Sequence, residues 1–342
     1  MSSPSPPAAL PPASPTPLPP ITAPPPPLEY TTLLAFFHTH RHTPSQISLL
    51  PAPYTEILSS PPHLGIPKQC LITAFVHARR IFQLYPSPSP RELLDATTIL
   101  LLAASEHLTA LNTRKRYFHT HLAAGEELVW LESLLTSPLP RHNKSPLLWA
   151  HRRWVLSCVS AASTAATSTT TTELDIVRKS AEVHPRNYYA WNHARWVVER
   201  FAGAAQEEED QEVERQLSFC WRHAEDVGVW AFLGWLLERC ERVQTVEKVV
   251  VEAVEYAREV APGHESVWCT LRTLVGRVSP AARERVLEML EKCGSVEGMG
   301  EERAREIVLE ERAVTWIRRF GQREKPPVIS PPDRGHGNGA ST

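Results

Sequence analysis

The stretch HPRNYYAWNHARWVVER, residues 184–200, carries two tryptophans five residues apart with an arginine between them. On a helix, Trp191 and Arg195 are four residues apart and lie on one face. Trp196 lies about 140° further around the axis, since a helix has 3.6 residues per turn. The two indole rings therefore face different neighbours. This spacing predicts a helix that is packed from two sides, as in the interior of a stack of helices.

The residues before this helix predict a helical hairpin. The segment ELDIVRKSAEV, residues 173–183, has apolar spacings of three and four and is expected to form the first helix. Pro185 ends it, because the residue before a proline avoids the α-helical region. Asn187 is a favourable N-cap for the second helix. Arg195 is expected to lay its guanidinium on the ring of Trp191, in a cation–π contact.

The same phrase recurs along the chain. KSPLLWAHRRWVL, residues 144–156, matches RNYYAWNHARWVV, residues 186–198, without a gap. Weaker copies place positions 111, 230 and 268 on the first tryptophan, so successive anchors at 111, 149, 191, 230 and 268 are 38, 42, 39 and 38 residues apart. Such a period fits one helix pair per repeat. The residues assigned a structural role in the repeats are Trp149, Arg153, Trp154, Asn187, Trp191, Arg195, Trp196, Trp230, Trp235, Trp268 and Arg272.

These observations predict an all-α fold, an αα-superhelix in which about five to seven helical hairpins form a right-handed solenoid. Residues 29–320 are expected to form this helical-repeat domain. Residues 1–28, rich in proline, and residues 321–342, rich in proline and glycine, are expected to be disordered tails. The low-complexity segment at 160–172 is expected to be a flexible insertion.

Composition argues against several classes of function. The formal net charge of −2 gives no electrostatic reason to expect nucleic acid as a partner. The longest apolar run, residues 99–104, is too short to span a membrane, and no secretory signal precedes the widely spaced cysteines, so a cytoplasmic protein is expected. Of His38, His40 and His42, only the first and last share a helical face, and no further ligands complete a tetrahedral set, so no metal is expected on this chain.

The repeated phrase resembles a known family. The pattern W-x-H-x-R-W after a turn of the type [KR]-[NS]-[YP], at this period, is similar to the α-subunit repeat of protein prenyltransferases. The resemblance covers residues 90–280 and extends more weakly to 320. Repeat order, the proline-rich start and the degenerate outer repeats are most similar to the branch of α-subunit repeat-containing proteins.

The resemblance implies a function that needs a second chain. In this family a crescent of helical hairpins wraps a separate β subunit, which holds the catalytic zinc and most of the isoprenoid pocket. The heterodimer transfers a farnesyl or geranylgeranyl group from its diphosphate to a cysteine near the C-terminus of a protein substrate. The implied role here is an α-type subunit that is inactive alone, with no cofactor of its own and zinc on the partner.

The family's lysine and tyrosine that contact the diphosphate fall on Arg186 and Tyr188. An arginine keeps the charge and binds phosphate oxygens well, and a tyrosine can donate its phenolic proton to them. Both would stabilise charge on the leaving diphosphate. Lys144 and Pro146 hold the matching places one repeat earlier, and a second arginine common in the family is replaced by Ala194.

These departures keep a second interpretation open. The chain could be a helical-repeat scaffold that binds partner proteins and has no transferase role. Without the resemblance, Arg186 is simply a solvated turn residue. An adaptor like the tetratricopeptide or HEAT repeat proteins fits the period but not the Trp/His/Arg phrase.

Overall fold

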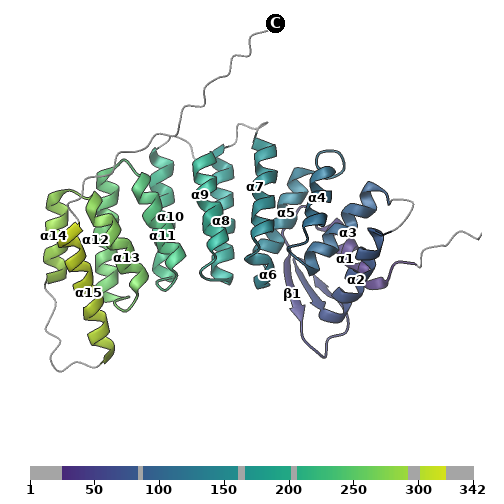
Figure 1. The fold of residues 1–342 in the computed structure, drawn as a ribbon, viewed down its shortest axis with the longest axis horizontal. Coiled ribbons are helices and arrows are strands. Elements are labelled where there is room, and N and C mark those ends of the chain that lie inside the picture. The colour runs from purple at the N-terminus through teal and green to yellow at the C-terminus, as the bar shows by residue number, and fades with distance from the viewer. Residues whose placement is uncertain (1–24, 84–87, 161–165, 202–205, 292–300, 321–342) are drawn as a thin grey trace, which may run out of the picture.

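The computed structural model describes residues 25–83, 88–160, 166–201, 206–291 and 301–320. Most of them are helical, and the helices stand side by side in a single gently bowed row (Figure 1). The α-helices are α1 Leu28–Thr39, α2 Lys68–Ile81, α3 Pro90–Ala103, α4 Leu108–Arg116, α5 Ala124–Leu135, α6 Pro140–Asn143, α7 Pro146–Ser160, α8 Ala166–Val183, α9 Tyr188–Phe201, α10 Gln206–Arg222, α11 Val227–Arg239, α12 Val243–Glu259, α13 Glu265–Leu274, α14 Pro280–Glu291 and α15 Glu301–Phe320. The prediction of an all-α solenoid is confirmed.

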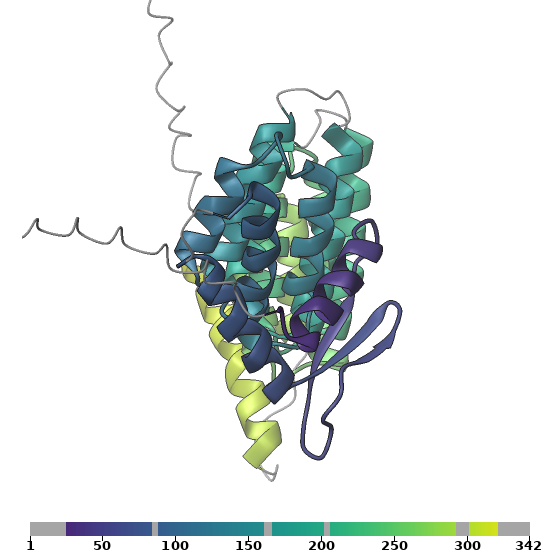
Figure 2. The same ribbon diagram turned by 90° about the vertical axis from the view of Figure 1, so that its right-hand side faces the viewer.

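Successive helices pair as antiparallel hairpins. The pairs α3–α4, α5–α7, α8–α9, α10–α11, α12–α13 and α14–α15 each pack together, and α7, α9, α11 and α13 form a continuous inner series through contacts of each with the next. Seen along the row, the hairpins lie behind one another (Figure 2). One large apolar core runs from Tyr30 in α1 to Ile317 in α15. Each hairpin therefore depends on its neighbours to cover its apolar faces.

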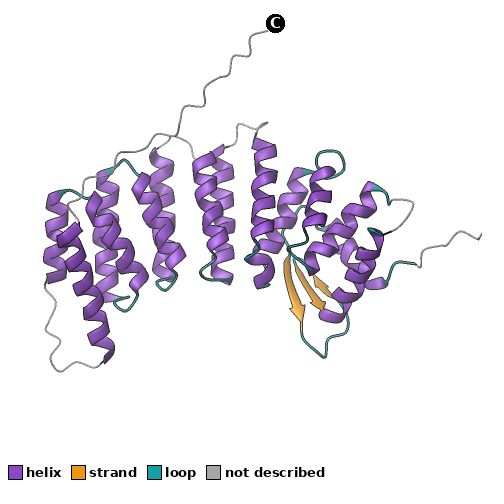
Figure 3. Cartoon of the chain, in the orientation of Figure 1, coloured by secondary structure: helices purple, strands orange, loops and turns teal. Residues whose placement is uncertain are grey.

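A small sheet at one end departs from the sequence prediction. Strands β1 Gln46–Leu50, β2 Leu58–Ser60 and β3 His63–Pro67 follow α1 in the chain. The strand order is β1-β3-β2, with β1 parallel and β2 antiparallel to β3. It lies outside the row of repeats (Figure 3). Its strands are short and separated by proline-containing loops, so they carry too little alternation to be recognised, although Ile47, Leu64 and Ile66 are fully buried.

The insertion expected at 160–172 is also different from the prediction. Helix α7 continues to Ser160 and α8 begins at Ala166, so residues 166–172 form the first turns of α8. Thr170 and Thr171 are half-buried there and lie near Val198 of α9. Packing therefore overrides the low helix propensity of a threonine run. Residues 161–165 and the predicted tails at 1–24 and 321–342 lie outside the described residues.

The two-sided packing inferred from the tryptophan spacing is confirmed. Trp191 is 2 % exposed and its ring centroid lies 5.2 Å from that of Phe232 in α11. Trp196 instead packs into a small cluster with Phe201 and with Leu156 of α7. One ring thus faces the following hairpin and the other faces the preceding one. The first tryptophans of each repeat, Trp149, Trp191, Trp230 and Trp268, are all buried, and Trp154, Trp196 and Trp235 are half-buried.

The prediction of a cation–π contact between Arg195 and Trp191 is wrong, because the ring that Arg195 approaches is that of Phe232. The Arg195 Cζ atom lies 6.0 Å from the ring centroid of Phe232, and its guanidinium donates at 3.4 Å to the backbone carbonyl of Trp191. The indole of Trp191 is turned into the core against α10 and α11. Arg195 stays at the half-buried seam between hairpins, where the ring within its reach is that of the buried Phe232.

Candidate functional site

The turn between α8 and α9 carries the two residues placed at a diphosphate site by the family resemblance. Arg186 has a left-handed backbone conformation, with φ of 59°, and its side chain is exposed. Tyr188, the first residue of α9, is 65 % exposed. A left-handed conformation costs a non-glycine residue about 1–2 kcal/mol. The turn therefore keeps a long cationic side chain where glycine would be more stable.

Contacts from both neighbouring hairpins fix this turn. The backbone N–H of Arg186 donates to the buried carboxylate of Asp226, with an N–Oδ2 distance of 2.7 Å. The other oxygen of Asp226 accepts the N–H of Gly228 at 2.8 Å and caps α11. From the preceding hairpin, the Lys144 ammonium donates to the Pro185 carbonyl at 3.0 Å. The backbone of the turn is thus held while the side chains of Arg186 and Tyr188 face solvent.

Asn187 caps α9, and it also joins two hairpins. Its Oδ1 accepts the N–H of Ala190 at 3.3 Å. Its Nδ2 donates to Oδ1 of Asn143 at 2.6 Å and to Oγ of Ser180 at 3.1 Å. Because Asn187 is completely buried, these bonds fix both the start of α9 and its position against α6. The cap therefore sets the place from which Tyr188 projects.

The position four residues before each anchor has the same capping role in four repeats. The side chains there accept backbone N–H groups of the first helical turn, at 3.2 Å for His107, 3.1 Å for Ser145, 3.3 Å for Asn187 and 2.8 Å for Asp226. Different residue types thus do one job, since each offers an acceptor at the N-cap. Because these residue types differ, the shared N-cap position could not be recognised by aligning the repeat sequences.

The turn gathers positive charge. The Lys144 ammonium reaches the carbonyl of Pro185, next to Arg186 in the chain, and Tyr188 adds a phenolic hydroxyl. The carboxylate of Asp226 already accepts two backbone N–H groups. Two cations and a hydroxyl are suited to a doubly charged phosphate ligand. Pro146 cannot donate from the turn that carries Lys144, but inter-repeat packing brings the Lys144 ammonium to the turn that carries Arg186.

Buried ionic networks connect the repeats behind this turn. Glu173 of α8 is 3 % exposed and accepts two hydrogen bonds from Arg152 of α7, at 2.7 and 2.6 Å. His193 of α9 lies 2.9 Å from Oε2 of Glu173 through its Nε2. The guanidinium also donates to the Leu128 carbonyl at 2.8 Å. One carboxylate therefore ties α7 of one hairpin to both helices of the next.

An equivalent network lies one repeat earlier. Glu127 of α5 accepts a hydrogen bond from Nε of Arg114 in α4 at 2.8 Å, and its Oε1 lies 2.8 Å from Nε2 of His151 in α7. Arg114 also donates to Thr97 and Thr98 of α3. In both networks the histidine is two residues, and the arginine three residues, after an anchor position. The networks thus follow the sequence repeat.

The next hairpin, α10–α11, lacks this arrangement. Glu212 stands 18 residues before Trp230, as Glu173 stands 18 before Trp191, but the matching arginine position holds Ala194 and the matching histidine position holds Phe232. Arg178 and Arg215 bind Glu212 instead. The absence of a family arginine at position 194 therefore changes a structural network and leaves the turn at 184–188 untouched.

The buried arginine of the repeat is not one of those assigned a structural role from the sequence. Arg153, Arg195 and Arg272, four residues after their anchors, lie at partly exposed seams, and Arg272 contacts Cys269 and Glu265. Arg152, one position earlier, is 2 % exposed. The position three residues after the anchor points to the first helix of the next hairpin, where the carboxylate lies. The signal available in the sequence was the single glutamate on the apolar face of each first helix.

Charge pairing sets the pKa values of these groups. Burial by itself raises the pKa of Glu173, but the Arg152 guanidinium and the hydrogen bond from His193 lower it to about 2. Burial likewise raises the pKa of Glu127, but Arg114 and His151 outweigh this effect and lower the pKa to about 2. Burial lowers the pKa of His193 despite its contact with Glu173. At pH 7 both carboxylates are therefore ionised and His193 is neutral.

We expect acid to weaken the fold in two stages. The folded pKa of His193 lies below 6.5, and those of Glu127 and Glu173 lie below 4.5, so the unfolded chain binds more protons in both ranges. The free energy of unfolding should therefore fall as the pH drops from 6.5 towards 2. Each carboxylate contributes about 3 kcal/mol of this loss. Urea unfolding at a series of pH values measures it.

A Glu173→Gln variant is the control for the acid experiment. It should be less stable at pH 7 and should show a smaller loss of unfolding free energy between pH 4.5 and pH 2, because one titrating carboxylate is gone. An unchanged slope in this variant would contradict the assignment. Glu212 differs, since burial raises its pKa above the ordinary value despite Arg178 and Arg215. Protonation of Glu212 should therefore not lower the free energy of unfolding at acid pH.

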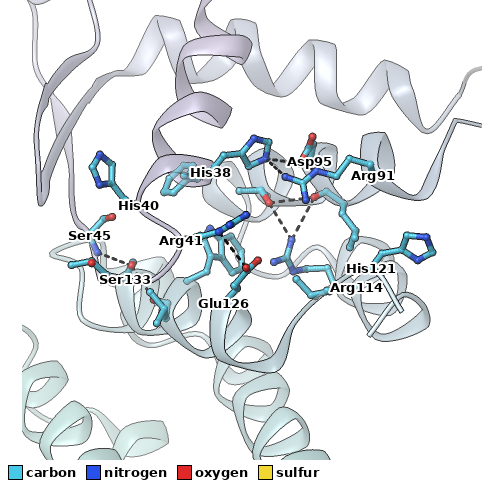
Figure 4. Close-up of a pocket in the computed structure, with 17 residues that line it drawn as sticks. His38, His40, Arg41, Ser45, Arg91, Asp95, Arg114, His121, Glu126 and Ser133 are labelled. Atoms are coloured by element: carbon cyan, nitrogen blue, oxygen red, sulfur yellow. Dashed lines mark hydrogen bonds and ion pairs between the residues drawn. The ribbon is translucent and has the colours of Figure 1, made fainter. Parts of the chain in front are cut away.

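A concave site lies at the amino-terminal end of the row. It is a cleft of about 70 Å³ between α1, α3 and α5 (Figure 4). Its three arginines are each paired: Arg41 with Glu126 at 3.3 Å, Arg91 with Asp95 at 3.4 Å, and Arg114 with Glu127. The charges of this cleft therefore balance one another. We interpret it as the joint that fastens α1 to the first hairpin.

The histidines considered as metal ligands have other contacts. The Nε2 atom of His38 lies 2.8 Å from the Asp95 carboxylate. Helix α1 ends at Thr39, so His42 lies beyond the helix. His38 and His42 therefore do not share a helical face, contrary to the expectation. Within the residues that the structure describes, no group of three His, Cys, Asp or Glu side chains is placed to hold a metal ion.

Comparison with known proteins places the repeats among named relatives. Residues 148–261 match the family model of the ECM9 middle domain. The protein prenyltransferase alpha subunit repeat-containing protein 1 of Danio rerio is 28 % identical over 183 residues, and that of Homo sapiens is 29 % identical over 184. The chain is similar to the protein prenyltransferase alpha subunit repeat-containing proteins. The resemblance carried by the repeat phrase is confirmed.

The similarity to the repeat-containing proteins has a limited span. The alignments cover 46 % of this chain, 42 % of the Danio rerio protein and 44 % of the human one. The chain thus matches less than half the length of these relatives. Among the helices of the described residues, none is long and apolar enough to cross a membrane.

Proposed function

We propose that this chain is the α-type subunit of a protein prenyltransferase and is inactive alone. In this proposal the row of hairpins wraps a catalytic β subunit. The heterodimer moves a farnesyl or geranylgeranyl group from its diphosphate to a cysteine near the C-terminus of a protein substrate. The similarity to prenyltransferase α-subunit repeat proteins and the curved wall of hairpins support this assignment.

One observation carries the proposal, namely the conformation of Arg186. A side chain at a positive φ is retained against a cost in stability where it has a use, and such positions are concentrated at functional sites. The turn is fixed by Asp226 and Lys144, while the Arg186 and Tyr188 side chains are exposed. A fixed backbone with free donors is suited to stabilising charge on a departing diphosphate.

The division of chemistry between the two chains follows from the donors available. The reaction needs an activated cysteine thiolate, which a zinc ion supplies when it is bound in the complex. The described residues offer no ligand set for that ion, so in the proposal zinc belongs to the β subunit. This chain contributes Arg186, Tyr188 and Lys144, which bind and orient the diphosphate.

The transfer reaction tests the proposal. The full chain is co-expressed with a prenyltransferase β subunit, and the purified complex is given labelled farnesyl or geranylgeranyl diphosphate and a protein ending in a cysteine motif. We expect label on the protein with the complex and none with either chain alone. A stable complex that never transfers label to any of the substrates would contradict the enzymatic role.

Arg186→Gly separates function from stability. Glycine relieves the left-handed strain, so the free energy of unfolding should stay unchanged or rise by up to about 1 kcal/mol. The transfer rate should fall by roughly 100-fold, because a donor to the developing charge is lost. Arg186→Lys should recover part of the rate. Arg186→Ala should slow transfer while pairing persists. Unchanged kinetics in the glycine variant would remove Arg186 from the site.

A second candidate function is a helical-repeat scaffold that binds partner proteins. It is favoured by the arginine at position 186, where the family has lysine, and by Ala194, where the arginine of the two earlier networks is missing and Arg178 binds Glu212 instead. A scaffold predicts partner binding without transfer of label, whereas the α-type subunit predicts transfer that Arg186→Gly slows. The transfer assay on the native chain and on the glycine variant therefore distinguishes the two functions.

A further inference from the structure

An apolar groove opens beside the small sheet, away from the cleft of Figure 4. It lies where α2, the end of α3, and α6 meet β1, and it has a volume of about 640 Å³. The groove is lined by Leu49, Lys68, Leu71, Ile72, Phe75, Leu102, Ala103, Ala104, Leu139, Pro140, Arg141 and His142. Nine of these twelve residues are apolar. This volume is in the range of small-molecule sites.

The groove has a buried floor and an exposed apolar rim. Leu71 and Leu102 are 8 % and 1 % exposed, whereas Leu49 and Ile72 at the rim are 43 % and 44 % exposed. Large apolar side chains left at this exposure, next to a concave surface, indicate a surface that another molecule covers. The four residues come from β1, α2 and α3, so the groove is formed by the fold and not by one loop.

The charges at the groove are all positive. Lys68 and Arg141 are exposed at its edge, and no aspartate or glutamate is among the lining residues. No ion pair joins either cation to a carboxylate within the described ranges, in contrast to Arg41 and Arg91 in the amino-terminal cleft. Lys68 also begins α2, whose first turn has no acidic residue and whose N-cap, Pro67, offers no side-chain acceptor. The helix end therefore adds positive potential.

The floor of the groove adds no charge. His142 is 5 % exposed, and its Nε2 lies 3.0 Å from the Leu101 carbonyl, to which it donates. Burial lowers the pKa of His142, so it is neutral at pH 7. An apolar, uncharged floor thus adjoins a cationic edge. Apolar surface and positive charge are both left without partners in one place.

We propose that this groove binds a single-chain amphiphile with an anionic head. Its hydrocarbon chain lies on the floor of Leu71, Phe75 and Leu102, and its head pairs with Lys68 and Arg141. The groove is lined by twelve residues, fewer than the roughly 20–30 that each partner contributes to a stable protein interface. The head group is a carboxylate or a phosphate, since both pair with lysine and arginine. The proposal does not depend on the transferase role.

Titration calorimetry on the full chain, without a β subunit, tests this proposal. The probes are dodecanoate, dodecyl phosphate, dodecanol and dodecyltrimethylammonium, each below its micelle concentration. We expect one site for the anionic probes, binding at least tenfold more weakly for dodecanol, and none for the cationic probe. Binding of dodecanoate alone identifies a carboxylate ligand, and binding of dodecyl phosphate alone identifies a phosphate ligand. Equal binding of anionic and cationic probes, or no binding of any, would overturn the proposal.

Matched variants locate the site. The double variant Lys68→Glu/Arg141→Glu should weaken anionic binding at least tenfold and leave dodecanol binding unchanged. The control is Arg79→Glu/Arg80→Glu, which makes the same charge change at exposed positions in the last turn of α2. Ala103→Phe, at a half-buried position, should fill the groove and weaken every probe. If the control variant matched the first double variant, binding would reflect net charge and not this groove.

Discussion

Glu173→Ala should lower the free energy of unfolding by about 3–5 kcal/mol, because removing one partner of a buried ion pair leaves the other charge uncompensated. The stranded group is Arg152, which is 2 % exposed and loses both hydrogen bonds to the carboxylate. His193 loses its partner at the same time. Urea unfolding followed by circular dichroism measures the loss.

Two controls separate this effect from a general sensitivity of α8. Glu182→Ala removes a glutamate from the same helix, but its side chain is 48 % exposed and lies 4.0 Å from Arg222, so its cost should be within about 1 kcal/mol. The triple variant Arg152→Met/Glu173→Leu/His193→Leu removes all three side chains of the network together. It should recover most of the lost stability, since apolar replacements of a whole buried network are often neutral. A triple variant as unstable as Glu173→Ala would contradict the account.

Trp191→Ala should cost about 3–5 kcal/mol of unfolding free energy, the range for deleting a large buried aromatic side chain. The ring is 2 % exposed, and its centroid lies 6.2 Å from that of Phe219 and 5.2 Å from that of Phe232. The next hairpin fits closely around it: a Cβ atom at Gly228 would lie 2.6 Å from Cδ1 of Trp191. The substitution therefore opens a cavity between two hairpins.

Trp316→Ala is the matched control for the tryptophan deletion. Trp316 lies in α15 and is 45 % exposed, so its removal should change the unfolding free energy by no more than about 0.5 kcal/mol. Thermal and urea unfolding of both variants provide the comparison. Similar losses in the two variants would mean that burial at the repeat anchors does not hold the hairpins together.

The sequence was sufficient for the architecture because one physical signal was repeated. Each first tryptophan is a large apolar residue that must be buried, and spacings of 38 to 42 residues leave room for one helix pair. The second tryptophan, five residues on, required a second neighbour. The structure has both neighbours for Trp191 and Trp196. The sheet was missed because its strands are three to five residues long.

The contacts between repeats could not be predicted from the sequence. Whether Arg152 or Arg153 is buried depends on how α7 is rotated against α8, and one residue changes the direction by about 100°. Lys144 reaches Pro185 only because two turns from different hairpins lie side by side. The left-handed conformation of Arg186 depends on Asp226, which lies 40 residues further along the chain. Site geometry in a solenoid is set by inter-repeat packing, which local patterns do not encode.

The most direct test of the central claim is whether this wall of hairpins holds a prenyltransferase β subunit. Sedimentation velocity on the co-expressed, purified chains measures the mass of the species formed. The account predicts one complex containing one copy of each chain, stable at micromolar concentration and retained in Arg186→Gly. A chain that sediments alone, with the β subunit recovered separately, would contradict the assignment as an α-type subunit.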